Sequence, residues 1–508
     1  MTKIHLLLKG SALQTIEVIV AIVAGLVTLP MMLSHLGADI YGIWILLGGI
    51  SSLLYIFDLG FASSVTRGVA KSISENNSQK TNAIINSSLL IYTALALIIC
   101  TTVAGIALFY TPAIDELITH RHFQFLILIM GCSIAIEFPF KAFAGLATAH
   151  LRYDLLAGYR ILVKTLNTTA LIFLITNGYD LVAIAILQLA TGVLSNLFFF
   201  KTAKVVYREL KIDLRLIESA AIKELFNYSA WAFLIDISRI FKERIDILFI
   251  GGFISLSAVS IYYIPVRLVE YTLQLLYKAL NLSLPILTSN CATENNAKFR
   301  EDLLLFNRAN SYFSVLTLLF FILFGQSILY YWMGSKFDYK SAYTILLILL
   351  AGRMSALASN GFNNGLYARA QHRLIAYLNL GEAIATAILL TIFLALFKLG
   401  PTAAALAIAI PLFISRIFLL PLLASRNMDI KNTLSFLMHS YRPAILLPAG
   451  ILSLTAFPVG GLLSSNHVWL SAIFTALLLM FLSLDLMPRE RALLTRTSVL
   501  FRSTGGGR

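Results

Sequence analysis

The stretch that decides the fold, residues 228–281, reads YSAWAFLIDISRIFKERIDILFIGGFISLSAVSIYYIPVRLVEYTLQLLYKALN. It is apolar enough to enter a bilayer, and yet it carries a row of charges. We predict a hairpin of two membrane helices, the first over about 226–249 and the second over about 259–288. A charge in hydrocarbon costs from about 3 to over 10 kcal/mol, so these charges must face protein or water.

Polar side chains recur on both predicted helices at helical spacing. On the second helix they fall within one stripe about 120° wide: Tyr263, Arg267, Glu270, Tyr271, Gln274, Tyr277, Lys278 and Asn281. On the first helix they form a row of Asp236, Arg239, Glu243 and Asp246, with Lys242 beside it and Arg244 facing elsewhere. The rows indicate either a polar pathway or ion pairs that join helices. Ion pairing explains the second helix less well, because Arg267 and Lys278 have only Glu270 as an acid on that helix.

The composition extends this reading to the whole chain. Of 508 residues, 58% are hydrophobic and 13% are charged, a charged share about half that of a soluble domain. We therefore predict an all-α polytopic membrane protein with about fourteen transmembrane helices. Their approximate centres are Ala21, Ser51, Ala96, Cys132, Ala170, Leu189, Ile237, Thr272, Thr317, Ala351, Leu389, Phe413, Ile451 and Thr475.

The longest connection is basic, spans about 207–223 and divides the predicted helices into two sets of six. We expect an N-terminal lobe at 1–210 and a C-terminal lobe at 211–440, related by a pseudo-twofold axis along the membrane normal. Helices 13 and 14 would occupy 441–487, and a basic tail 488–508. The cleft between two such lobes is the natural place for a site.

Basic residues gather in the even-numbered connections and at both ends of the chain. The odd-numbered connections hold only Arg121, Lys336, Lys340 and Lys398, so both termini are predicted to be cytoplasmic. This topology explains the net charge of +14 without a nucleic-acid partner. The three cysteines are isolated, and no metal spacing, nucleotide fingerprint or catalytic triad occurs. We expect neither an enzyme nor a metal site.

Residues 37–71 read GADIYGIWILLGGISSLLYIFDLGFASSVTRGVAK. The pairs Leu36-Gly37 and Tyr41-Gly42, the run Asp58-Leu59-Gly60, and Arg67 make this passage resemble bacterial Wzx-type polysaccharide (O-antigen) flippases. These belong to the multidrug/oligosaccharidyl-lipid/polysaccharide exporter superfamily, and the fourteen-helix layout extends the resemblance over the chain. It implies a transporter in the bacterial inner membrane that moves an undecaprenyl-diphosphate-linked oligosaccharide to the periplasmic leaflet by alternating access. Membrane lipids, a polysaccharide polymerase and a chain-length regulator are the partners expected with it.

A diphosphate and a sugar are bound by particular kinds of side chain. Arginine forks bind phosphate oxygens in bidentate fashion, while amides and tyrosines offer directional partners to hydroxyls. The predicted substrate-binding set is Arg239, Lys242, Arg267, Tyr271, Gln274, Arg353, Asn360, Asn363 and Asn364. The last four share one face of a single predicted helix. Polar contact between helices is the alternative reading of that asparagine-rich face.

The first lobe offers cations and acids. Lys141, Arg160 and Lys164 lie toward the cytoplasmic ends of two predicted helices, where they would receive the diphosphate first or serve as snorkelling anchors. Glu17 and Asp58 are candidates for proton or sodium coupling, the only cofactor-like requirement we expect. Alternatively, Asp58 pairs with a cation or caps a neighbouring helix.

A second function remains open, that of a cation-coupled multidrug or small-molecule exporter of the same superfamily. The cleft of such an exporter should be acidic or aromatic, because its substrate is cationic. The arginines on the predicted helices favour an anionic substrate instead.

Overall fold

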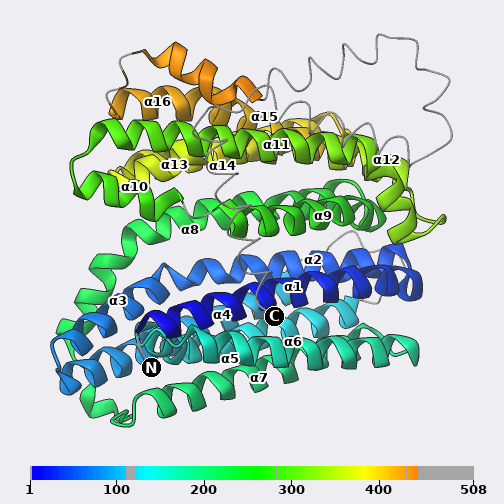
Figure 1. The fold of residues 1–508 in the computed structure, drawn as a ribbon. Coiled ribbons are helices and arrows are strands. Elements are labelled where there is room, and N and C mark those ends of the chain that lie inside the picture. The colour runs from blue at the N-terminus through cyan, green and yellow to red at the C-terminus, as the bar shows by residue number, and fades with distance from the viewer. Residues whose placement is uncertain (1–2, 110–119, 281–282, 429, 431, 444–508) are drawn as a thin grey trace, which may run out of the picture. The chain divides into compact units, whose positions relative to one another are not determined.

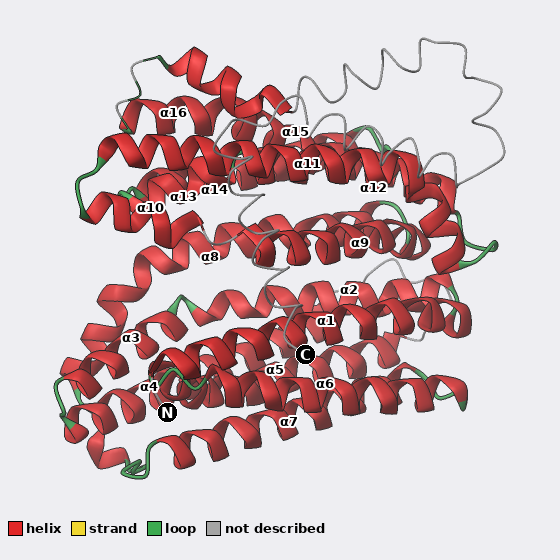
Figure 2. Ribbon diagram, in the orientation of Figure 1, coloured by secondary structure: helices red, strands yellow, loops and turns green. Residues whose placement is uncertain are grey.

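The computed structural model describes residues 3–109, 120–280, 283–428, 430 and 432–443, and no strand occurs among them (Figures 1 and 2). Contacts divide the chain into two units. Unit 1 comprises Met1–Lys278, Tyr330–Ile345 and Ala376–Ile408, and unit 2 comprises Ala279–Leu329, Leu346–Ile375 and Ala409–Arg508. The lobe boundaries proposed from the sequence stay predictions.

The first half of the chain forms helices of unit 1. They are α1 (Lys3–Leu36), α2 (Ala38–Leu54), η1 (Tyr55–Asp58), α3 (Phe61–Ser74), α4 (Ser78–Phe109), α5 (His120–Ala149), α6 (Tyr153–Thr176), α7 (Leu181–Val206), η2 (Leu214–Leu216), α8 (Ser219–Phe253) and α9 (Leu256–Leu280). Figure 1 shows α5, α6 and α7 running side by side. Each reverses direction after a short turn, so α5 and α7 are parallel.

The remaining described helices follow in the second half. They are α10 (Ser283–Ala292), α11 (Asn296–Met333), α12 (Tyr339–Ala358), α13 (Asn360–Ala368), α14 (His372–Leu390), η3 (Thr391–Leu396), α15 (Pro401–Ile414), η4 (Ser415–Leu419) and α16 (Leu420–Asn427). Residues 433–443 are helical as well.

The prediction of an all-α multi-pass membrane protein is confirmed. Ten helical stretches in the described part of the chain are long and apolar enough to cross a membrane. The charged helices α8 and α9, of 35 and 25 residues, are not among these ten. The first twelve predicted span centres each lie in a helix, whereas Ile451 and Thr475 lie outside the described residues. The total of fourteen spans and the sidedness stay predictions.

The connection between α7 and α8 is fastened to α4 by a ladder of asparagine side chains. Asn82 Nδ2 donates to the Glu209 carbonyl at 3.0 Å, while Asn82 Oδ1 accepts from Lys211 N at 2.9 Å. One turn further along α4, Asn86 bonds in the same way to Lys211 O at 2.8 Å and Asp213 N at 3.0 Å. Asn82 and Asn86 are one helical turn apart, and they bond to the backbone at alternate residues of the extended connection. Their side-chain amides thus make the kind of hydrogen bonds that a neighbouring strand would make.

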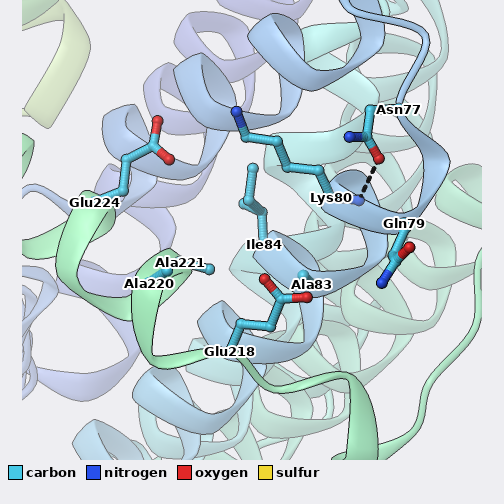
Figure 3. A pocket seen from close by; sticks show the side chains of 9 residues that line it. All are labelled: Asn77, Gln79, Lys80, Ala83, Ile84, Glu218, Ala220, Ala221 and Glu224. Atoms are coloured by element: carbon cyan, nitrogen blue, oxygen red, sulfur yellow. Dashed lines mark hydrogen bonds between the residues drawn. The ribbon is translucent and has the colours of Figure 1, made fainter.

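This ladder places the first turn of α8 beside the first turn of α4. A cavity of about 350 Å³ lies between the two turns, and Figure 3 shows Glu218 and Glu224 on one side of it and Lys80 on the other. The Lys80 backbone N–H donates to Asn77 Oδ1 at 2.9 Å. The Lys80 ammonium pairs with Glu75 at 3.1 Å. The basic connection is therefore an ordered part of unit 1.

Helix α1 contains a proline in mid-helix, Pro30. Proline has no N–H, so the carbonyl four residues earlier, on Leu26, loses its intrahelical partner. The indole Nε1 of Trp332 donates to that carbonyl at 2.8 Å. A side chain distant in sequence thus satisfies the group that the proline leaves open.

Candidate functional site

A cavity of about 850 Å³ opens inside unit 1, walled by α1, α2, α5, α6, α7, α8 and α9. This volume lies at the upper end of the range for small-molecule sites. Lining residues recur every three or four positions, so each helix presents one face. On α7, for example, they are Gln188, Thr191, Gly192, Ser195 and Asn196. At Gly25 a Cβ atom would collide with the Tyr271 hydroxyl, so glycine there lets α1 approach α9 closely.

One wall of the cavity is cationic. Arg267 on α9 donates from Nη1 to Glu270 Oε2 at 2.7 Å, and Arg244 Nη1 on α8 lies 3.5 Å from Glu270 Oε1. Arg267 Nε also donates to the Tyr263 hydroxyl, and the guanidinium lies 4.7 Å from the centre of the Tyr263 ring. One carboxylate is therefore shared by two arginines, which are held in fixed orientations.

Helix α6 adds two more cations to the cavity. Arg160 Nη1 lies 3.7 Å from Glu17 Oε1. The Lys164 ammonium has no hydrogen-bond or ion-pair partner among the described residues, and it interacts with Arg267 as a like charge. The lining includes two carboxylates, Glu17 and Glu137, against four cations. Even with Glu270 counted, positive charge is in excess among the side chains that the structure describes here, so an anion would be attracted to this wall.

A second wall, on α5 and α7, mixes apolar and polar lining residues and has no cation of its own, although the Arg160 guanidinium of α6 lies 5.8 Å from the centre of the Phe199 ring on α7. The Tyr55 hydroxyl of η1 donates to Glu137 Oε2 on α5 at 2.7 Å. Asn167 Nδ2 on α6 donates to Thr191 Oγ1 on α7 at 2.9 Å. Amides and hydroxyls at close spacing are suited to the hydroxyl groups of a sugar. The cavity thus combines the chemistry of an anion site with that of a saccharide site.

The structure brings several predicted site residues together on this lining: Glu17, Arg160, Lys164, Arg267, Tyr271 and Gln274. The side chains of Arg239 and Lys242 lie outside the described part of the structure. For the second predicted helix, α9, the polar stripe does face a cavity.

The asparagine-rich stripe lies in unit 2. Its predicted single helix is interrupted at Ser359, between α12 and α13. Arg353 is on α12, whereas the three asparagines are on α13, and the two helices together form one 30-residue candidate membrane span. Asn364 Nδ2 donates to Ser283 Oγ of α10 at 2.7 Å, which is the polar contact between helices given as the alternative. Asn360 and Asn363 each have one buried polar atom with no hydrogen-bond partner in the described structure.

Asp58 and Lys141 form a pair that is absent from the cavity lining. Lys141 Nζ donates to Asp58 Oδ2 at 2.6 Å, and Asp58 Oδ1 accepts from Ala62 N at 3.1 Å in the first turn of α3. Lys141 Nζ also lies 4.2 Å from the centre of the Phe138 ring. Both alternatives considered for Asp58 are realised, since it pairs with a cation and caps a helix.

Most lining residues of the cavity were not proposed from the sequence, and Arg244, Glu137 and Asn196 are three of them. Arg244 was expected to face away from the charged row, but its own side of α8 meets the cavity, and Asp246 of that row is buried and accepts from Tyr262 at 2.7 Å. Glu137 had no assigned role. Asn196 belongs to a neutral polar face of α7 that spacing alone reveals, because residues 188, 191, 195 and 196 share one side of a helix.

Known proteins of the same fold include three solved structures. The lipid II flippase MurJ, in an inward closed conformation, has a TM-score of 0.66 and 16% identity, covering 97% of this chain and 99% of that chain. An inward-facing multidrug resistance MATE family transporter of the MOP superfamily scores 0.62 at 15% identity, covering 80% and 94%. A MOP superfamily transporter from Pyrococcus furiosus, described as having a binding pocket of reverse polarity, has a TM-score of 0.57 at 15% identity, covering 84% of this chain and 96% of that chain.

At such identities the likeness establishes a shared fold. Among the curated proteins, none matches this chain by sequence. The sequence pattern of the family described as "Polysaccharide biosynthesis protein" matches residues 40–342, more than half of the chain. The chain therefore belongs to the polysaccharide biosynthesis protein family.

Proposed function

We propose that this protein is a flippase for an undecaprenyl-diphosphate-linked oligosaccharide, such as an O-antigen repeat unit, in the bacterial inner membrane. It carries the head group from the cytoplasmic to the periplasmic leaflet by alternating access. The observation that supports this most is the cationic wall of Arg244, Arg267 and Lys164, which shares one cavity with amides and hydroxyls.

The cationic wall is suited to a diphosphate. Two guanidinium groups, held by one carboxylate, keep donors free for phosphate oxygens in bidentate geometry. Lys164 supplies a point charge beside them. A cationic drug would be repelled by the same surplus, so the cavity supports an anionic substrate over the alternative of multidrug export.

The membrane potential favours the proposed direction. Moving negative charge outward from a negative interior gains about 2.3 kcal/mol per charge per 100 mV, so a diphosphate of charge near minus two gains roughly 4 to 5 kcal/mol. This gain requires that the cations stay in place, as expected for side chains fixed on helices. Glu17, which pairs with Arg160 on the lining, is our candidate for proton or sodium coupling.

The experiment uses cells whose surface polysaccharide depends on this chain. We expect Arg267→Ala, Arg244→Ala and Lys164→Ala each to abolish surface polysaccharide at normal protein level in the membrane. Lys204→Ala, an exposed cation at the end of α7, is the matched control and should leave it normal. Normal polysaccharide in all three cavity variants would reject the proposal.

The same cells test the other parts of the proposal. Arg239→Ala, Lys242→Ala and Arg353→Ala show whether those cations also take part in diphosphate binding, and Asn360→Ala, Asn363→Ala and Asn364→Ala test the sugar contacts proposed for unit 2. Cross-linking in the same cells would detect a polysaccharide polymerase or a chain-length regulator beside the protein.

A further inference from the structure

The amide of Asn167 joins helices α6 and α7 on the lining of the large cavity, and its orientation is fixed. Asn167 Nδ2 donates to Thr191 Oγ1 at 2.9 Å. The Thr191 hydroxyl has one hydrogen, which it donates to carbonyls of its own helix, Leu187 O at 2.9 Å and Gln188 O at 3.2 Å. Because Thr191 Oγ1 can then only accept from the amide, the nitrogen of Asn167 has to face Thr191.

The oxygen of the same amide is left open. Asn167 Oδ1 has no hydrogen-bond partner among the described residues, and it is not buried. Asn167 and Thr191 both line the cavity, so this oxygen is available to a bound molecule. An amide oxygen accepts hydrogen bonds and donates none. At this point the cavity therefore presents an acceptor whose direction is set by α7.

This acceptor lies one helical turn from the cations of α6. Lys164 precedes Asn167 by three residues, so the two side chains share a face and differ in height by about 4.5 Å. Both line the cavity, and Arg160 lines it one turn further away on the same helix. A phosphate beside Lys164 would thus place the sugar that it carries beside Asn167. The nearest polar substituent of that sugar is on the carbon next to the one that bears the phosphate.

An acceptor of fixed direction distinguishes substituents by whether they can donate. A hydroxyl or an acetamido N–H donates to Asn167 Oδ1, whereas a fluorine cannot donate and would displace the water that does. The charges of Lys164 and Arg160 act equally on two substrates that differ only at this substituent. The discrimination is therefore separate from the attraction of the diphosphate.

We propose that Asn167 accepts a hydrogen bond from the sugar directly joined to the diphosphate, and that Thr191 is the positioning residue that keeps Asn167 Oδ1 available to it. The substrate class is then a lipid diphosphate whose first sugar carries a hydroxyl or an acetamido group beside the phosphate-bearing carbon. This inference rests on the proposed function, because the cationic wall has to bind the diphosphate first.

The test measures binding to the full-length protein in lipid nanodiscs. The probes are undecaprenyl diphosphate, its conjugate with glucose and its conjugate with 2-deoxy-2-fluoroglucose, in which fluorine replaces one hydroxyl. Asn167→Leu removes the acceptor, and Thr191→Val removes the atom that holds the amide. Thr168→Val is the matched control, since Thr168 is on α6, bonds its own backbone at Lys164 and is not among the lining residues.

The wild-type protein should bind the glucose conjugate about fivefold more tightly than the fluorinated one. In Asn167→Leu and in Thr191→Val this preference should fall to about twofold or less, with affinity for the bare diphosphate unchanged. In Thr191→Val the released amide can turn its nitrogen toward the fluorine, which accepts. Thr168→Val should behave as wild type. If Asn167→Leu fails to fold, Asn167→Ala is measured in its place, and the same loss of preference is expected.

A purely structural role, failure of the inference and failure of the proposed function give different results. If the Asn167–Thr191 bond only joins the helices, both variants melt at a lower temperature but keep the wild-type preference. That result, with Arg267→Ala still weakening every probe, overturns the inference alone, as does equal binding of the two conjugates by the wild-type protein. A wild-type protein that binds none of the diphosphate probes overturns the proposed function and the inference with it.

Discussion

Replacing Glu270 with glutamine tests the cationic wall in a direction that a general loss of structure would not produce. The carboxylate is the partner of both Arg267, at 2.7 Å, and Arg244, at 3.5 Å. Glutamine keeps the shape but removes the charge. The two guanidiniums then face each other with no carboxylate from α9 between them, and an incoming anion becomes their partner.

The structure sets the size of the effect. With an effective dielectric constant of about 20, the two charge pairs are worth about 6 and about 5 kcal/mol before desolvation is counted. The three side chains are between 19% and 28% exposed, so water recovers much of this, and a net cost of about 2 kcal/mol is reasonable. An anion that restores the lost pairing should therefore bind about 30-fold more tightly.

The assay is binding of undecaprenyl diphosphate to the purified protein, together with thermal unfolding with and without the probe. Glu270→Gln should melt at a lower temperature without the probe and should gain more stability from it than wild type does. The control is Glu75→Gln, which removes the partner of Lys80 outside the 850 Å³ cavity. It should change neither the affinity for the probe nor the stability that the probe adds. Weaker or equal binding by Glu270→Gln would refute the assignment of Arg244 and Arg267 to the anion.

Three further variants test the supports of the cavity. Trp332→Phe leaves the Leu26 carbonyl without a donor and should cost about 1–3 kcal/mol. Faster amide hydrogen exchange in α1 would show the loss, and unchanged exchange would contradict it. Asn86→Leu removes two bonds to the α7–α8 connection, so limited proteolysis there should accelerate, and wild-type cleavage would count against the ladder. Asp58→Asn and Lys141→Met should show a coupling free energy of about 1–3 kcal/mol in a double-mutant cycle of unfolding, while a coupling near zero would deny the pair.

The sequence predicts α9 well because its polar residues follow one helical period. Arg267, Tyr271 and Gln274 are spaced four and three apart, and a stripe with that period has to face protein or water in a membrane. The stripe therefore identifies one wall of the cavity even when the residues that contact it are not known. Its C-terminal end, with Tyr277 and Lys278, does not reach the lining.

Helix α8 shows where periodicity fails. Arg244 and Asp246 lie on different faces, and both faces are charged, so spacing cannot say which one meets the cavity. Tertiary contacts decide which face meets the cavity: Asp246 accepts a hydrogen bond from Tyr262, and Arg244 forms an ion pair with Glu270. A sequence pattern gives the face of a residue but not the neighbour that neutralises it.

Other features depended on backbone detail. Ser359 separates α12 from α13, and the only mark of this break in the sequence is the Asn360-Gly361 pair that follows it. Asn196 is buried, and its Nδ2 has no hydrogen-bond partner in the described structure, which the sequence pattern does not show.

The central claim is that the cationic wall holds the diphosphate while the head group crosses the membrane. It is tested most directly in proteoliposomes that carry an undecaprenyl-diphosphate-linked sugar, by measuring how much of the sugar becomes accessible to a membrane-impermeant probe. We predict that wild-type protein exposes the inner-leaflet sugar and that Arg244→Ala/Arg267→Ala, inserted at the same level, does not. Equal exposure with wild type and this double variant, or none with wild type, would contradict the claim.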